Sequence, residues 1–392
     1  MRPIPKLTGP LAGKKRILIF NWRDIENVYA GGAEVYIHEL AKRWAADGNA
    51  VTIFSSNDRQ HSPYAVIDGV RVIRRGGFYG VYALAVLYYI FRFRGKFDVI
   101  VDCENGIPFF TPFYAKEPVF CLLHHIHQEV FRKSLIRPLA IFASFLEKSM
   151  MPLVYRNSRF ITISESSRKS MEELKITKHE ISIVNPGVNL EYFSPGEKLK
   201  TPLISYVGRL KEYKSVDILI AAFAKVLEKV PEAFLVIAGD GEEEKNLKRV
   251  AVDFKIADKV MFAGKISEEN KKYVMQSSWV FVNPSMMEGW GITTIEANAC
   301  GTAVVASDVP GLRDSVKNEE TGFLSPYGNV EALSERILFF IQNKGARKLA
   351  EANAVHWAKN FSWDKSSQLF LGIISGAEYP AADYEAALTE RI

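Results

Sequence analysis

Cysteine is scarce in this sequence. The three cysteines, Cys103, Cys121 and Cys300, lie far apart and lack the paired spacing of a zinc site or a disulfide framework. Such usage fits a reducing compartment. Residues 1–13 include basic side chains but no apolar core of signal-peptide length, so nothing indicates export. We therefore expect a cytoplasmic protein.

Long hydrophobic runs are also missing. The longest apolar stretch, Phe78–Phe91, has fourteen residues, short of the ~20 that a helix needs to span a bilayer. No G-x-G-x-x-G follows the first predicted strand, because Gly31-Gly32 comes after a polar loop and has no third glycine. The first absence argues against a transmembrane segment, and the second disfavours a nicotinamide-dependent oxidoreductase.

The size and composition are those of a folded protein with two domains. The chain has 392 residues, 48% of them hydrophobic and 24% charged. Residues 1–195 carry 26 Lys+Arg and 18 Asp+Glu, a net of +8, and the remainder carries 24 against 27, a net of −3. The basic first half indicates either an anionic partner or ordinary solvated charge.

Short apolar, β-rich runs alternate with stretches long enough for crossover helices. The predicted strands of the first half are Arg16–Asn21, Val51–Phe54, Val99–Val101, Val119–Leu123, Phe160–Ile163 and Ile181–Val184, with a helix over Ala33–Trp44. After the turn at Asn185-Pro186-Gly187 the predicted strands are Leu203–Val207, Phe234–Ala238, Val260–Phe262, Val280–Val282 and Ala303–Ala306, with helices at Ser215–Lys229 and Val330–Asn343.

This pattern predicts an α/β fold with two Rossmann-like, doubly wound parallel sheets. We place an N-terminal domain at residues 1–195 and a C-terminal domain at 196–375, with 376–392 packing back on the first. In such sheets ligands bind beyond the carboxyl ends of the strands, which is where functional residues are expected.

The strongest local motif runs from Glu288 to Glu296 and follows a predicted strand. Gly289 and Gly291 let the backbone approach a ligand, and the free amides of a helix start can bind phosphate. Glu296 lies ~7–8 Å further along the helix than its start. One carboxylate would suit a sugar and the other a ribose. Alternatively, Glu288 complements the helix dipole and Glu296 is a locally satisfied buried group.

A second motif, Gly208-Arg209-Leu210, ends the first strand of the second half, and Lys214 follows it. Two cationic side chains at a strand end can bind a diphosphate through charge and hydrogen bonds. The alternative is that both are solvated or paired with Glu212 or Asp217.

Six landmarks in this order resemble the retaining GT-B glycosyltransferases of the group 1, family 4-like type, which include phosphatidylinositol mannosyltransferases and sucrose-phosphate synthases. They are Gly31-Gly32-Ala33-Glu34, Asn185-Pro186-Gly187-Val188-Asn189, Gly208-Arg209-Leu210 with Lys214, Ala238-Gly239-Asp240-Gly241, Phe262-Ala263-Gly264, and Glu288 through Glu296. The resemblance covers nearly the whole chain. It implies two domains that face a central cleft and a nucleotide-diphosphate sugar as donor.

By this resemblance, Arg209 and Lys214 bind the donor diphosphate, Glu288 contacts the transferred sugar and Glu296 holds the ribose. The other implied donor-binding residues are Gly32, Gly239, Gly264, Lys265, Gly289, Trp290, Gly291 and Ile292. The implied chemistry is transfer with retention to an acceptor hydroxyl, with no cofactor or metal. Binding and catalytic residues overlap, so a catalytically silent sugar-nucleotide-binding protein is the alternative.

A histidine often faces the sugar in this family. His124 matches best because it closes a predicted strand, with His125 and His127 as alternatives. Their spacing lacks the carboxylates of a metal site. Asp102, Glu104 and Asn105 follow another strand and are either acceptor-side contacts or turn residues.

The acceptor is expected to be a glycan, a lipid-linked sugar or a small molecule, and nucleic acid is not an expected partner. Basic residues flank Phe78–Phe91 and are interspersed in Phe131–Tyr155. Such stretches suit interfacial helices on the anionic inner membrane face. The alternative is that both are ordinary core helices.

Overall fold

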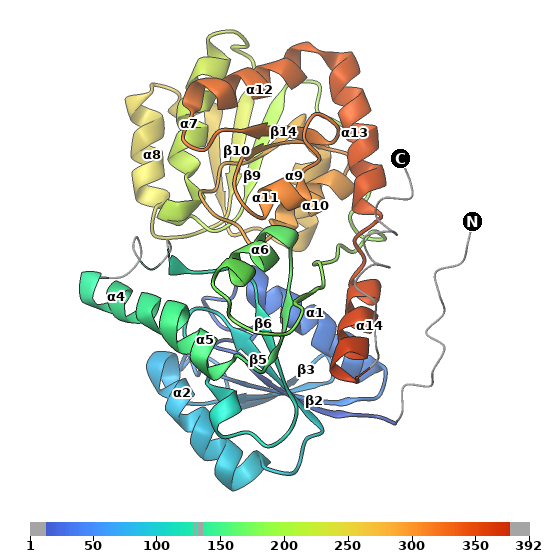
Figure 1. The fold of residues 1–392 in the computed structure, drawn as a ribbon. Coiled ribbons are helices and arrows are strands. Elements are labelled where there is room, and N and C mark those ends of the chain that lie inside the picture. Colours follow the sequence, from blue (N-terminus) through green and yellow to red (C-terminus); the bar gives the residue numbers. More distant parts are fainter. Residues whose placement is uncertain (1–12, 129–130, 132–135, 377–392) are drawn as a thin grey trace. The chain divides into compact units, whose positions relative to one another are not determined.

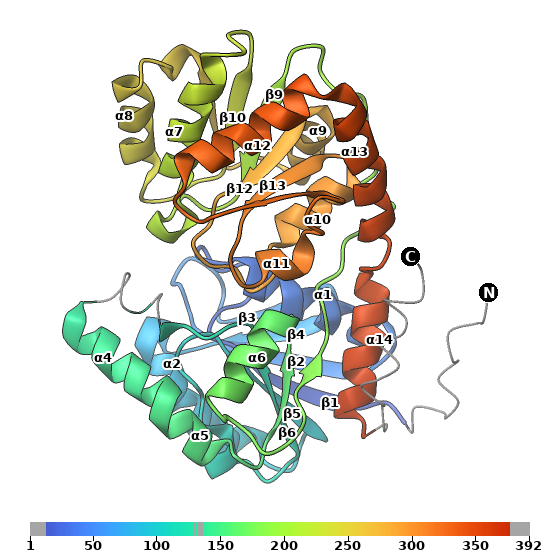
Figure 2. The ribbon, with the colours of Figure 1, turned by 45° about the horizontal axis from the view of Figure 1, so that its top comes forward.

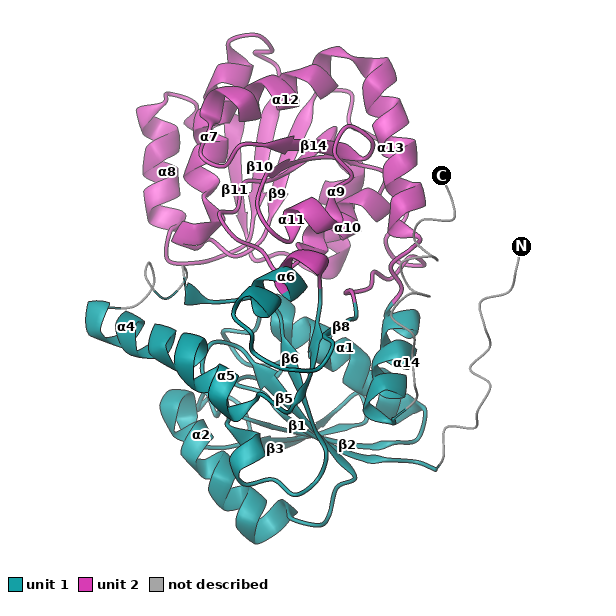
Figure 3. Cartoon of the chain, viewed as in Figure 1, with its two compact units in different colours: residues 1–163, 168–184, 363–392 teal, residues 164–167, 185–362 magenta. Residues whose placement is uncertain are grey.

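The computed structural model describes residues 13–128, 131 and 136–376, and they form two compact units (Figure 3). Unit 1 comprises residues 1–163, 168–184 and 363–392, and unit 2 comprises residues 164–167 and 185–362. The division at 184/185 differs from the predicted 195/196. The chain also returns to unit 1 at Trp363, before the predicted 376. The predicted packing of residues 377–392 lies outside the described residues.

Two contacts explain these boundaries. The Val188 amide donates to the Phe361 carbonyl at 3.3 Å, so the linker pairs inside unit 2 as soon as the first sheet ends. Helix α14 (Trp363–Ile374) then packs on α1 (Gly32–Ala46) in unit 1 (Figure 2). Trp44 Nε1 donates to the Ser367 carbonyl at 3.0 Å. The Trp44 and Phe370 ring centroids are 5.3 Å apart, so α14 completes the core of unit 1.

The sheet of unit 1 has the strand order β3-β4-β2-β1-β5-β6-β7-β8. Its strands are β1 (Arg16–Phe20), β2 (Ala50–Ser55), β3 (Tyr64–Ile67), β4 (Val70–Arg74), β5 (Val99–Glu104), β6 (Val119–Leu123), β7 (Arg159–Thr162) and β8 (Ser182–Ile183). Among the described residues, the other α-helices of unit 1 are α2 (Gly77–Tyr88), α4 (Arg137–Phe145), α5 (Met151–Val154) and α6 (Glu165–Glu173), which begins in unit 2.

The expectation of a wholly parallel sheet is wrong at one edge of unit 1, where β3 and β4 pair antiparallel. The turn between them is Asp68-Gly69, with φ of 49° and 81°. Positive φ at both turn residues suits the right-handed twist of a two-residue hairpin, and Asp-Gly favours it. That dipeptide was the available signal in the sequence.

The sheet of unit 2 is wholly parallel, with the order β11-β10-β9-β12-β13-β14. Its strands are β9 (Leu203–Val207), β10 (Phe234–Ala238), β11 (Val260–Gly264), β12 (Val280–Asn283), β13 (Ala303–Ser307) and β14 (Gly322–Ser325). Its helices are α7 (Val216–Leu227), α8 (Glu244–Asp253), α9 (Glu268–Ser277), α10 (Ile292–Ala299), α11 (Leu312–Ser315), α12 (Val330–Gln342) and α13 (Lys344–Ala358) (Figure 1). The predicted class of two doubly wound α/β units is confirmed.

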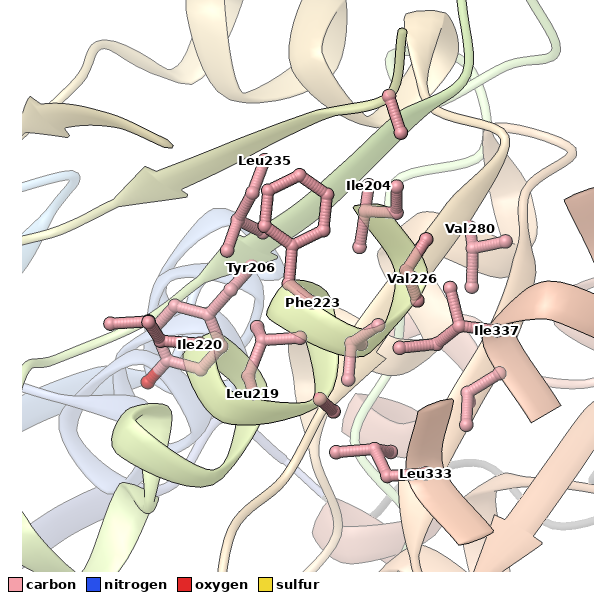
Figure 4. Close-up of a cluster of buried hydrophobic side chains, with 14 of the residues drawn as sticks. Ile204, Tyr206, Leu219, Ile220, Phe223, Val226, Leu235, Val280, Leu333 and Ile337 are labelled. Carbon is pink, nitrogen blue, oxygen red and sulfur yellow. The ribbon is translucent and has the colours of Figure 1, made fainter. Parts of the chain in front are cut away.

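One face of this sheet is covered by α7 and α12 (Figure 4). Alternate residues of β9, such as Ile204 and Tyr206, meet Leu219 and Phe223 of α7 in a buried cluster. The i, i+4 spacing of these helix residues sets one stripe against the pleated sheet. Each fully buried large apolar side chain contributes roughly 1.5–3 kcal/mol. This core holds the strand ends, and therefore the loops after them, in fixed positions.

Candidate active site

The strand order of unit 2 reverses between β9 and β12. Helices leave these two neighbouring strands toward opposite faces, so the loops after them open a crevice where ligands of such sheets bind. Those loops carry the two strongest sequence motifs, residues 208–214 after β9 and residues 284–291 after β12. The fold therefore brings the two motifs to one place.

Lys214 and Glu288 form an ion pair across this point. The Nζ to Oε1 distance is 2.5 Å, and the side chains are 13% and 17% exposed. Ser285 Oγ lies 3.0 Å from the same carboxylate oxygen. Lys214 thus pairs with the other predicted site residue and not with Glu212 or Asp217. Partial burial makes such a pair stronger than an exposed one and fixes both side chains.

Arg209 is anchored from both ends. Its Nη2 donates to the Tyr213 hydroxyl at 2.9 Å, and its carbonyl accepts from the Tyr206 hydroxyl at 2.9 Å. The neighbouring loop packs closely, because a Cβ on Gly239, whose φ is 136°, would lie 1.8 Å from the Gly208 carbonyl oxygen. A glycine at position 239 is therefore required for the packing of the two loops. The predicted contact of Gly239 with a donor is a separate role. The two tyrosines were not predicted, because their role depends on contacts between loop residues.

Helix α10 begins directly after the loop that carries Glu288. Its N-cap is Gly291, with φ of 86°, and its first turn, residues 292–295, is Ile-Thr-Thr-Ile. No side chain caps the first amides of α10, all of whose residues are described. They keep the partial positive charge of a helix start. Trp290 is 4% exposed and packs on Phe361, at 5.1 Å between ring centroids, which fixes the loop before the helix.

Glu296 lies inside α10 and is 8% exposed. Its Oε1 is 2.9 Å from Lys271 Nζ on α9, whereas Oε2 has no hydrogen-bond partner among the described residues. Burial raises the pKa of this carboxyl, and the Lys271 ammonium opposes that shift. Lys271 was missed because it lies 25 positions earlier, on another helix. The open oxygen can accept a hydrogen bond from a hydroxyl.

Gly264 ends β11, which lies two strands from β9, and Lys265 follows it at the same edge of the sheet. Gly264 has φ of 63° and open space where a Cβ would stand, and its carbonyl accepts from the Gly239 amide at 2.7 Å. The Lys265 side chain is exposed. Both are therefore accessible from the crevice edge of the sheet.

In unit 1, the predicted glycine loop leads into α1, which starts at Gly32. The Glu34 carboxylate accepts from the Gly31 amide at 2.7 Å and from Arg23 Nε at 3.0 Å. These bonds hold the loop against the helix start. Arg23 was not among the predicted residues, since it lies eleven positions earlier in a loop.

The three clustered histidines have different surroundings. His124 follows β6, is 5% exposed and meets the Tyr36 ring edge-on, and burial lowers its pKa to about 3. The His127 amide donates to Glu147 at 2.7 Å, and its ring lies 4.2 Å from that of His125, centroid to centroid. Because its pKa is about 3, His124 is a neutral imidazole near pH 7. Within the described residues, no group of three or more His, Cys, Asp or Glu could hold a metal ion.

The acids of β5 are internal. Asp102 is fully buried and accepts from the Thr111 hydroxyl at 2.5 Å and the Tyr155 hydroxyl at 2.8 Å, and burial raises its pKa to about 6. Glu104 is 1% exposed, and neither carboxyl oxygen is hydrogen-bonded within the described residues. Burial raises its pKa well above the usual range. Asn105 Nδ2 donates to Asn21 Oδ1 at 2.6 Å. Asp102 is thus held inside unit 1 through Oδ2, whereas its buried Oδ1 has no hydrogen-bond partner among the described residues.

Comparison with protein families matches both halves of the chain. The family described as glycosyl transferases group 1 matches residues 189–357, and glycosyltransferase family 4 matches residues 30–192. The D-inositol 3-phosphate glycosyltransferase of Mycobacteroides abscessus is 33% identical over 53% of this chain and 48% of that protein. The enzyme of the same name from Kribbella flavida is 27% identical over 87% and 90%. The chain therefore spans about half the length of the first relative and most of the second.

Solved structures show the same fold at low identity. The sucrose-phosphate synthase of Thermosynechococcus elongatus superposes with a TM-score of 0.77 at 20% identity, over 92% of this chain and 98% of that one. Anabaena HepE, solved with UDP and glucose, gives a TM-score of 0.72 at 18% identity, over 92% and 99%. The GT-B fold class expected from the sequence is confirmed.

Proposed function

Because this chain belongs to the group 1 glycosyltransferases, we propose that it transfers a sugar from a nucleotide-diphosphate sugar to an acceptor hydroxyl with retention of anomeric configuration. The observation that carries this proposal is the Lys214–Glu288 pair at the reversal of the unit 2 sheet. It puts a cation for the leaving diphosphate 2.5 Å from a carboxylate for the sugar. The UDP and glucose solved with Anabaena HepE support a nucleotide-sugar donor.

The cationic groups bind the donor diphosphate. The Arg209 guanidinium offers several N–H donors in one plane, and the Lys214 ammonium is a compact positive charge. The backbone amides at the start of α10 add fixed dipoles. As the sugar–oxygen bond breaks, negative charge grows on the diphosphate. Groups already held in place stabilise that charge without reorganising.

The two glutamates bind the donor at separate points. Glu288 accepts from sugar hydroxyls while it keeps Lys214 oriented, and Glu296 accepts from the ribose through Oε2, which lacks a partner within the described residues. Lys271 favours the ionised form of Glu296. His124 stays neutral, because its pKa is about 3, and acts by hydrogen bonding to the sugar.

Retention follows if the acceptor attacks from the side that the diphosphate leaves. The bond from the anomeric carbon to the phosphate oxygen breaks, and a bond to the acceptor oxygen forms on the same face. The acceptor proton passes to the departing phosphate oxygen, so no protein nucleophile is needed. In this mechanism the enzyme works without a metal ion or other cofactor.

Product stereochemistry and donor binding test the proposal. Calorimetry with UDP, GDP and ADP identifies the base, and NMR of the product shows whether the linkage keeps the donor configuration. Activity should persist in EDTA. An inverted linkage, or activity that EDTA abolishes and a divalent ion restores, would overturn the mechanism. Hydrolysis or binding of the donor with no transfer to any acceptor would favour the silent binding protein.

We further propose a lipid-linked acceptor, reached by docking of unit 1 on the inner membrane face. Helices α2 and α4 lie on the side of unit 1 opposite α14 (Figures 1 and 2). In α4 the buried residues are Ala140 and Ala143, whereas Ile141 and Phe142 are 63% and 58% exposed. A helix that turns its large apolar residues outward suits a bilayer surface. No helix among the described residues is long and apolar enough to cross a bilayer.

Vesicle sedimentation tests the docking. The variant Phe142→Ser should weaken binding to vesicles that contain anionic lipid, because it removes an apolar side chain from the interface. Phe254→Ser is the matched control, since Phe254 belongs to unit 2 and is 48% exposed. If the two variants bind the vesicles equally, or if the wild type does not bind them at low salt, the docking proposal fails. The acceptor would then be a soluble molecule.

A further inference from the structure

Unit 1 has a basic pocket outside the predicted site residues. It lies where β4 runs into α2, encloses about 520 Å³ and is lined by Arg59, Arg74 and Arg75 together with Tyr64. Its lining contains no acidic side chain among the described residues. The pocket opens at the carboxyl end of β4, the edge where ligands of parallel sheets bind. We call it the α2 pocket.

Arg75 is held rigidly, but by neutral groups. Its Nε donates to the Tyr88 hydroxyl at 2.6 Å, and its Nη1 donates to the Pro63 carbonyl at 3.0 Å. The guanidinium carbon lies 4.2 Å from the centroid of the Tyr64 ring. Within the described residues Nη2 makes no hydrogen bond and no carboxylate pairs with this cation. A fixed guanidinium with an open edge is preorganised for an oxyanion.

The acids nearest the pocket already have partners. Arg74 is neutralised by Asp24, at 2.7 Å, and by Glu26, at 2.8 Å. Asp58 binds His61 Nδ1 at 2.8 Å. Arg59 is exposed and forms no ion pair with the described residues, so Arg59 and Arg75 bring two uncompensated charges to one hollow.

The surroundings of the pocket identify the source of the anion. Helix α2 begins at its rim, and Phe78 and Tyr79 of the first turn are 47% and 66% exposed. Further along α2 and the turn after it, Leu87 and Phe91 are 48% and 76% exposed. Aromatic and aliphatic side chains beside a cationic hollow match the layer in which lipid phosphates and acyl chains meet.

We propose that the α2 pocket binds the phosphate of an anionic lipid headgroup through Arg59 and Arg75. This phosphate site is distinct from the donor diphosphate site of unit 2. The inference rests on the proposed docking of unit 1 and names the group that orients it on the membrane. The pocket is at β4, four strands from β6 in the sheet order, so the bound phosphate lies well away from His124.

The experiment compares two double variants on phosphatidylcholine vesicles with and without phosphatidic acid. Arg59→Gln/Arg75→Gln should bind acidic vesicles about 30-fold more weakly than wild type, which corresponds to about 2 kcal/mol, or roughly 1 kcal/mol per arginine. The control Lys175→Gln/Lys178→Gln removes the same charge from exposed positions of unit 1. It should lose no more than a few-fold. Equal losses in the two pairs would overturn the proposal.

Four further measurements keep the outcomes separate. The thermal midpoint checks folding, and Arg75→Lys, which keeps the charge but loses the fork, should bind with intermediate strength. Glycerol 3-phosphate titrated into wild type should bind far more weakly than vesicles, and affinity as high as that for vesicles would overturn the lipid assignment. Nucleotide affinity should stay at the wild-type value in both pairs. If wild type itself fails to bind acidic vesicles, the docking of unit 1 fails, whereas transfer to a soluble acceptor would leave the glycosyltransferase chemistry intact.

Discussion

The acids at the strand ends of the two units are in opposite electrostatic states. In unit 2, Glu288 follows β12, is partly exposed and pairs with Lys214 at 2.5 Å. In unit 1, Glu104 ends β5, is 1% exposed, and burial raises its pKa well above the usual range. Unit 2 therefore has paired charges beside its strand ends, whereas unit 1 buries the two acids of β5, Asp102 and Glu104, and burial raises the pKa of both.

The sheets differ in a related way. Unit 2 is wholly parallel and reverses its strand order between β9 and β12, which fixes one binding point. Unit 1 ends in the β3–β4 hairpin and exposes apolar residues of α2 and α4. The proposed donor site of unit 2 therefore rests on the geometry of its sheet, whereas the proposed membrane contacts of unit 1 rest on the exposed apolar side chains of its helices.

The largest expected effect comes from Glu288→Gln, which removes the charge that orients Lys214. We expect kcat to fall by about 10²–10³, because removing one preorganised group that stabilises the transition state has that effect. Turnover with saturating donor measures it. The thermal midpoint should fall by only a few degrees, since the side chain is not part of the core.

The matched control is Glu268→Gln in the same unit. Glu268 also pairs with a lysine, Lys271, at 2.8 Å, but it is 68% exposed. Its substitution should leave turnover within about two-fold, because exposed pairs contribute about 0–1 kcal/mol. Native turnover in Glu288→Gln would break the contrast between the two units.

The next effect concerns the ribose contact. Glu296→Gln should weaken nucleotide binding by roughly 10- to 100-fold, the loss of a charged hydrogen bond worth about 1.5–3 kcal/mol. Calorimetry with the nucleoside and its diphosphate measures it. Lys271→Met should weaken binding in the same direction, because Lys271 opposes the raised pKa of Glu296. If the affinity for the free base falls as much as the affinity for the nucleoside and its diphosphate, Glu296 does not contact the ribose.

The sequence alone indicated that the two strongest motifs of unit 2 lie together, and it did so for a physical reason. Glu288 to Glu296 is a continuous strand-end motif, and Lys214 follows another, so strand order alone brings them together. Lys271 escaped prediction because its contact with Glu296 joins two helices. The spacing of residues within one helix does not reveal which side chain of another helix pairs with its carboxylate.

The sequence predicted less of unit 1. Asp102 lies in β5, and the bonds that its Oδ2 accepts from the Thr111 and Tyr155 hydroxyls come from residues that no local spacing connects to it. The hairpin at Asp68-Gly69 did have a signal, whereas the open edge of Arg75 depends on Tyr64 and Tyr88, which no local spacing reveals.

A smaller effect is the pH dependence of stability that the buried Asp102 gives to unit 1. Asp102 has a pKa of about 6 in the folded protein against an ordinary value of 3.8, so between these values the folded protein holds a proton that the unfolded chain has lost. Its contribution to stability is therefore present below pH 4 and is lost as the pH rises to 6, by about 1.4 kcal/mol per pH unit.

The variant Asp102→Asn should remove this dependence. Relative to wild type, its unfolding midpoint should rise as the pH goes from 4 to 6, measured by thermal denaturation. His124 acts in the opposite direction, because its pKa is lowered to about 3 and its contribution is lost as the pH falls. The difference between variant and wild type cancels the His124 term. A pH-independent difference would show that Asp102 is ionised in the folded state.

The smallest expected effect lies at the hairpin edge of unit 1. Gly69 has φ of 81°, and a Cβ there would lie 3.4 Å from that of Ala45, so Gly69→Ala adds backbone strain and slight crowding. We expect a loss of about 1 kcal/mol, close to the penalty for an L-residue in this conformation. Gly80→Ala in α2 of the same unit is the control, because Gly80 does not have a positive φ and no atom lies within 4 Å of where its Cβ would stand. The midpoint of unit 1 should fall by a few degrees in Gly69→Ala, while nucleotide affinity, which depends on unit 2, stays unchanged. A loss of nucleotide affinity in Gly69→Ala alone would show that the hairpin edge and the donor site are energetically coupled, and the functional division between the two units would then fail.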